Sequence, residues 1–122
     1  MGIEHSIKEL ELCELEKILK SERAASEVAF RSMMNKLKLI FLMSSDIEIL
    51  TKIALVFNTF LIHSSVPLIV SKLLDKKYHK RGGTLAYALL GLKKGDFMEE
   101  LKGLKDKNIS YEMRHMLELN NI

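Results

Sequence analysis

The apolar residues of this chain recur with a period of 31 residues, and this repeat limits the possible fold more than any other sequence feature. A shift of 31 residues superposes four sets of apolar positions: Leu39, Val70 and Leu101; Leu42, Leu73 and Leu104; Ala54, Leu85 and Met116; Phe57, Ala88 and Leu119. A period of this length is typical of helical hairpins, which bury their apolar faces only by stacking on one another. We therefore predict three stacked hairpins at residues 35–65, 66–96 and 97–122. Residues 1–34 are expected to form an N-terminal cap, with all 122 residues in a single domain.

Within each period the apolar residues have the spacing of α-helices. From Ile47 to Leu61 they recur at steps of three and four residues, which places them on one face of a helix. Pro67 suits the first turn of the next helix, because the N–H that proline lacks has no partner there. The same reasoning predicts helices over these ranges: 3–20, 24–43, 46–63, 67–76, 84–92, 96–105 and 110–119. No segment alternates with the period of two that marks a strand, so we predict an all-α fold.

The composition excludes several classes of protein. With 48% hydrophobic residues, six Gly and one Pro, the chain is neither disordered nor low in complexity. The lone Cys13 excludes an internal disulfide framework and a multi-cysteine zinc site, and we expect it to be a small buried side chain. The longest apolar stretch, Ile53–Ile62, is shorter than the roughly 20 residues of a membrane-spanning helix. We therefore expect a cytoplasmic protein without a membrane partner.

Catalytic and metal-binding patterns are sparse. None of the histidines lies three or four residues from another histidine or from the cysteine; they are His5, His63, His79 and His115. The Gly82-Gly83 pair lacks the preceding strand of a phosphate-binding loop, so we interpret it as a tight turn between helices. We therefore expect no enzymatic activity, no cofactor and no metal.

The second repeat resembles a HEAT repeat. In that family a proline opens the first helix, an aspartate ends it, and a basic residue precedes a second helix rich in small residues. The matching residues are Pro67, Asp75 and Arg81, in the segments VPLIVSKLLD (66–75) and KRGGTLAYAL (80–89). The resemblance covers residues 46–119 and implies a small right-handed α-solenoid of HEAT or armadillo type.

The stretch from Arg81 to Leu89 is similar to short bacterial HEAT-repeat proteins, some of which are immunity proteins of contact-dependent growth inhibition toxin systems. The third repeat departs from the pattern, because it lacks the proline and has Glu112 where Arg81 stands. The resemblance implies a non-enzymatic immunity protein, an antitoxin that binds a cognate bacterial toxin, a nuclease, and blocks its active site. A basic nucleic-acid-binding protein and a general HEAT-type scaffold are the alternatives.

Two surfaces are candidates for binding such a toxin. The outer faces of the second helices would form a continuous ladder of these residues: Glu48, Lys52, Thr59, His63, His79, Tyr87, Lys94, Arg114, Glu118 and Asn121. Residues 1–30 carry a net charge of −3 against +6 for the remainder, and they supply a second, acidic candidate: Glu9, Glu11, Glu14 and Glu16. Both candidates have a plain alternative, because any solvent-facing side of a helix is polar.

The turn at residues 76–81, with the sequence KKYHKR, is the basis of the nucleic-acid alternative. Its cations would bind phosphates, and Tyr78 would stack on a base. A solvated loop in a basic protein explains the same pattern.

Overall fold

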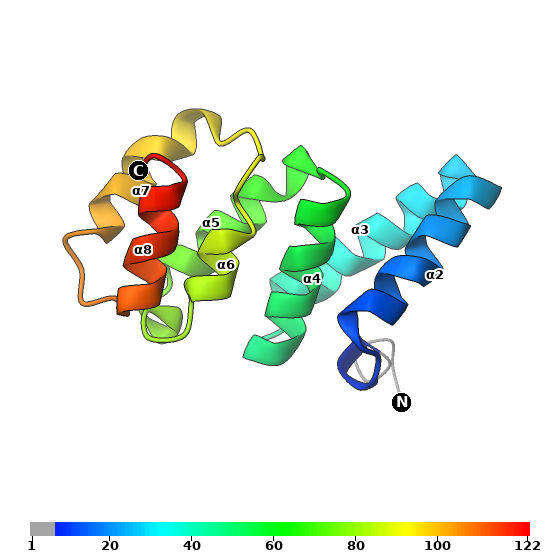
Figure 1. Ribbon diagram of the computed structural model, residues 1–122, viewed down its shortest axis with the longest axis horizontal. Coiled ribbons are helices and arrows are strands. Elements are labelled where there is room, and N and C mark those ends of the chain that lie inside the picture. Colours follow the sequence, from blue (N-terminus) through cyan, green and yellow to red (C-terminus); the bar gives the residue numbers. More distant parts are fainter. Residues whose placement is uncertain (1–6) are drawn as a thin grey trace. The chain divides into compact units, whose positions relative to one another are not determined.

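The computed structural model describes residues 7–122, and every regular element in this part of the chain is helical (Figure 1). The α-helices are α2 (Leu12–Ala25), α3 (Glu27–Met43), α4 (Ile47–Thr59), α5 (Val66–Leu74), α6 (Gly83–Tyr87), α7 (Met98–Leu104) and α8 (Tyr111–Leu119). Short 3-10 turns separate some of them: η1 (His63–Ser65), η2 (Lys76–Tyr78) and η3 (Gly95–Phe97). The predicted all-α fold is confirmed. Within residues 7–122, no helix has the length and apolar character needed to cross a bilayer.

The chain divides into two compact units, Met1–Val56 and Phe57–Ile122, and the division falls inside α4. In the first unit, α2 and α3 pack against each other and are joined by one extended residue, Ser26. The Ser26 hydroxyl accepts a hydrogen bond from the Ala29 N–H at 3.1 Å and so caps the start of α3. Because α3 runs unbroken from Glu27 to Met43, the expected boundary between a cap ending at residue 34 and a hairpin beginning at residue 35 is wrong.

The buried residues show that the repeat changes length along the chain. Three buried residues of α3 precede three buried residues of α5 by 32 positions: Met34, Leu37 and Phe41 match Val66, Ile69 and Leu73. The second helices agree, since Ile53, Ala54, Val56 and Phe57 match Leu85, Ala86, Ala88 and Leu89 at the same interval. Only from the second hairpin to the third is the interval 31, where Val70, Leu73 and Ala86 match Leu101, Leu104 and Leu117.

This difference of one residue corrects the predicted core. Leu39 and Leu42 are 62% and 49% exposed, although the 31-residue alignment placed both in the interior. Leu119 is 49% exposed for a related reason, because α8 buries Met113 and Leu117 instead. One residue turns a helix by about 100°, which is enough to move a side chain from the core to solvent.

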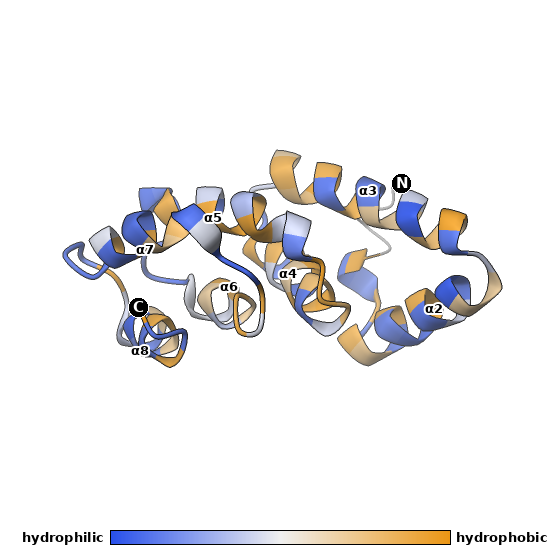
Figure 2. Ribbon diagram, turned by 90° about the horizontal axis from the view of Figure 1, so that it is seen from above, coloured by the Kyte–Doolittle hydropathy of each residue, from blue (hydrophilic) through white to orange (hydrophobic). Residues whose placement is uncertain are grey.

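In the second unit, successive hairpins lie side by side. α5 packs against both α6 and α7, and α6 packs against α8, so the first helices share one layer and the second helices share another (Figures 1 and 2). Pro67 lies in the first turn of α5, as predicted. Continuation of this stack as a right-handed solenoid stays a prediction.

Two glycines set the close packing of α6 against α8. A Cβ added at Gly82 would lie 2.9 Å from the Tyr78 carbonyl oxygen and 3.0 Å from Met113 Sδ. A Cβ at Gly83 would lie 3.1 Å from Glu112 Cβ. The pair therefore serves as the tight connection that the sequence predicted, through space rather than through an unusual backbone angle.

Candidate functional site

In the first unit, the ladder residues of α4 take part in a local cluster of charges. Lys52 is half-buried, and its Nζ donates hydrogen bonds to the carbonyl oxygens of Ile7, Lys8 and Leu10 at 3.3, 2.7 and 2.8 Å. Glu48 lies 3.8 Å from Lys52 Nζ and 4.0 Å from Lys8 Nζ. Lys52 is therefore a structural tether, and its assignment to an outward-facing binding ladder is wrong.

Beside this cluster, Lys8 Nζ donates a hydrogen bond to Asp46 Oδ2 at 3.0 Å. This hydrogen bond is the main reason that the pKa of the Asp46 carboxyl is lowered and that of Lys8 is raised. The Asp46 Oδ1 also accepts the Glu48 N–H at 2.9 Å, so one carboxylate both begins α4 and anchors the N-terminal turn.

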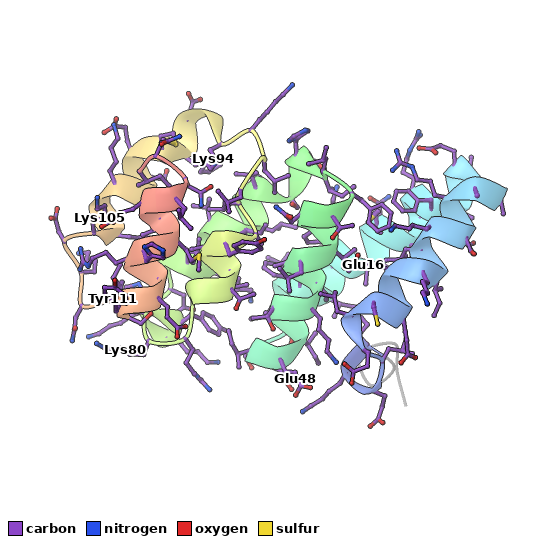
Figure 3. The ribbon with its side chains drawn as sticks, viewed as in Figure 1. Glu16, Glu48, Lys80, Lys94, Lys105 and Tyr111 are labelled. Carbon is purple, nitrogen blue, oxygen red and sulfur yellow. The ribbon has the colours of Figure 1, made fainter. Side chains whose placement is uncertain are left out.

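The acidic candidate surface is spread around α2. Glu9, Glu11 and Glu14 are exposed and Glu16 is half-buried (Figure 3). Glu14 and Glu16 lie about 200° apart around the helix, so they do not present one continuous acidic face.

Cys13 is exposed on the same helix, so the expectation of a buried thiol is wrong. The core side of α2 is set by Leu15 and Leu19. Cys13 points about 200° away from Leu15.

In the second unit, much of the predicted ladder is used by the fold. Arg114 Nη1 donates to the Lys105 carbonyl at 2.7 Å, and Lys94 Nζ donates to the Leu92 carbonyl at 3.1 Å. Burial lowers the pKa of the Lys94 ammonium group. Arg114 and Lys94 thus bind carbonyls of their own turns.

The two ladder histidines are also engaged. His63 Nδ1 accepts the Lys93 N–H at 3.1 Å. His79 is only 8% exposed, so its expected place on a solvent-facing surface is wrong. The physical reason is that its carbonyl accepts the Ser110 N–H at 2.7 Å, which holds the turn after η2 against the start of α8.

The ladder side chains that stay open in the second unit are Thr59, Tyr87, Glu118 and Asn121. Tyr87 is 42% exposed on α6, and Glu118 is exposed on α8, which packs beside α6. Sequence reasoning missed the most exposed aromatic residue of this region, Tyr111, which is 80% exposed (Figure 3).

Tyr111 stacks on His115 one helical turn later. Their ring centroids lie 6.2 Å apart and the planes differ by 1°. Tyr111, His115 and Glu118 project on the side of α8 opposite the buried Met113 and Leu117. The spacing of four residues between two rings was visible in the sequence and would have revealed this pair.

We call the exposed side chains Tyr87, Tyr111, His115 and Glu118 the tyrosine face. Its helices are held firmly, because the Asn120 amide at the end of α8 donates to the Ala86 carbonyl at 3.0 Å. The face thus combines aromatic area with an acidic group on a rigid two-helix support, which is the chemistry of a protein-binding surface rather than of a catalytic centre.

The basic turn differs from its prediction in one decisive respect. Tyr78 is 1% exposed, so its ring is part of the core and the expected stacking on a base is wrong. Lys77 Nζ lies 5.5 Å from the centre of that ring. In residues 7–122, no three His, Cys, Asp or Glu side chains are grouped so as to hold a metal ion.

Comparisons with protein-family models, curated proteins and solved structures found no significant match to this chain.

Proposed function

We propose that this protein is a non-enzymatic binding module that uses the tyrosine face to bind a partner protein. The observation that carries the proposal is the stacked Tyr111–His115 pair, which stands exposed on α8 beside Tyr87 of the neighbouring helix. Tyrosine is enriched at protein interfaces because it buries a large area while keeping one polar group, and few rotamers are lost when it binds.

The partner we propose is a cognate bacterial toxin with nuclease activity, which the protein neutralises as an immunity protein in the cytoplasm. The support for this finer statement is the HEAT-like stretch from Arg81 to Leu89. The acidic groups at the tyrosine face add to it, since Glu112 and Glu118 are exposed on α8 and nuclease active sites are lined with cations. Neutralisation would follow if the face covers the catalytic groove and excludes nucleic acid from it.

The test is co-purification of the full chain with the product of the adjacent open reading frame, followed by affinity measurement. We expect a stable complex that abolishes the partner's toxicity. Tyr111→Ala should weaken it by at least about tenfold, because an exposed aromatic anchor contributes roughly 2 kcal/mol or more at the centre of an interface. Val28→Ala is the matched control, since Val28 is exposed on α3 in the other unit.

The result that overturns the proposal is a neighbouring product that is not toxic or does not bind. A complex that both variants leave unchanged would instead move the interface away from the tyrosine face.

Nucleic-acid binding through the basic turn and a general scaffold role are the other functions we considered. The burial of Tyr78 removes the ring that single-strand binding would use, and we therefore rank protein binding first. A salt titration separates the two, because affinity for nucleic acid falls steeply with ionic strength.

A further inference from the structure

A cavity of about 630 Å³ opens between two turns of the second unit, away from the residues of the tyrosine face. One wall is the turn around η2 and the other is the loop that leads into α8. The lining residues are Leu74, Lys76, His79, Lys80, Asp106, Lys107 and Asn108.

Two hydrogen bonds hold the walls together. Lys80 Nζ donates to Asn108 Oδ1 at 2.7 Å, and the Ser110 N–H donates to the His79 carbonyl at 2.7 Å. Both bonds join residues far apart in the sequence, so the shape of the cavity is set by the fold and does not depend on a ligand.

The cavity has a net positive lining. Lys76, Lys80 and Lys107 bring three ammonium groups to it, against the single carboxylate of Asp106. Lysine ammonium groups bind phosphate as point charges, and a concave site lets several of them approach one anion. Because Asp106 repels every anion, the three cations favour a doubly charged group over a singly charged one.

His79 supplies an independent observation. The side chain lines the cavity and is more than nine-tenths buried, and its Nε2 is buried without a hydrogen-bond partner. Buried ring nitrogens nearly always have a partner in folded proteins. A phosphate oxygen is the kind of acceptor that a protonated Nε2 lacks here.

We propose that this cavity binds the phosphate group of a small phosphomonoester. A phosphomonoester carries close to two negative charges at neutral pH, which matches three ammonium groups and one carboxylate. A nucleic-acid backbone fits less well, since each phosphodiester carries one charge and the turn presents no exposed ring for a base.

The test is an NMR titration of the full chain with inorganic phosphate and phenyl phosphate, and with dimethyl phosphate as the diester, all at constant ionic strength. We expect both dianions to cause saturable shifts at the amides of residues 76–80 and 106–108 and at the His79 ring nitrogens. Dimethyl phosphate should bind at least about tenfold more weakly.

Variants make the test specific. Lys76→Gln with Lys80→Gln should weaken binding at least about tenfold, whereas the matched double variant Lys17→Gln with Lys20→Gln, on α2, should not change it. Asp106→Asn should tighten binding, which keeps the proposal testable if the lysine variant disturbs the turn. Linear shifts without saturation, equal weakening by the two double variants, or a diester that binds as well as the monoester would each overturn the proposal.

Discussion

In the first unit, α2 and α3 are 14 and 17 residues long, whereas α5 to α8 of the second unit have only five to nine residues each. Each helix end leaves backbone groups without an intrahelical partner, so short helices have more such groups for each residue. The second unit meets this demand with side chains. Asn58 Nδ2 donates to the Ala88 and Leu90 carbonyls, and Arg114 donates to the Lys105 carbonyl.

The comparison teaches that polar residues have different duties in the two units. In the second unit, amide and guanidinium groups of the helices are consumed by backbone carbonyls, so a polar side chain there is weak evidence for a binding surface. In the first unit, charges pair mostly with one another near the surface, as Lys8 does with Asp46. Exposed aromatic residues are the better guide to function in the second unit.

The largest effect is expected from a test of the 32-residue interval that relates the two units. Leu37 is 1% exposed and Leu39 is 62% exposed, although the 31-residue alignment favoured Leu39 as a core residue. Leu37→Ala should lower the free energy of unfolding by about 2–5 kcal/mol, because it removes buried methyl groups and leaves a cavity. Leu39→Ala should change it by less than about 0.5 kcal/mol. Urea denaturation measures both, and equal losses would contradict the interval.

A smaller effect tests whether close packing holds the short helices. Gly82→Ala should lower the free energy of unfolding by about 1–3 kcal/mol, since the added Cβ would lie 2.9 Å from the Tyr78 carbonyl oxygen, a backbone atom. Gly103 in α7 is the control, because an added Cβ there has no atom within 4 Å. Gly103→Ala should raise stability by about 0.5–1 kcal/mol through helix propensity. Thermal unfolding of the two variants gives the comparison, and a neutral Gly82→Ala would show that the α6–α8 contact is not tight.

The smallest effect concerns the surface charges of the first unit. Since the pKa of Asp46 is lowered on folding, its ion pair with Lys8 stabilises the protein above the ordinary carboxyl value of 3.8. That contribution is lost as the pH falls through the lowered pKa. The difference in unfolding free energy between the natural protein and Asp46→Asn should therefore shrink between about pH 5 and about pH 2, and it should be small throughout because the pair is exposed. A difference that does not change with pH would rule out the pair as a contributor.

Sequence reasoning predicted the helical class and the turn at Gly82-Gly83, because these follow from local spacing. It missed the one-residue change in the repeat, since α3 carries apolar residues on its exposed side too, at Leu39, Leu42 and Met43. A count of apolar matches cannot tell that side from the buried one.

The candidate site was less predictable for a different reason. Lys52 and Arg114 have the polarity of surface residues, and only the folded chain brings carbonyl oxygens within their reach. Tyr111 stood outside the aligned positions of the repeat, so the alignment drew attention away from it.

The exposed thiol of Cys13 has a practical consequence for all of these experiments. Because it is the only cysteine in the chain and lies on α2, a maleimide dye will attach at one known point, far along the sequence from the tyrosine face. The anisotropy of that dye then reports the slower tumbling of the labelled protein when a partner docks, without any substitution in the unit under study.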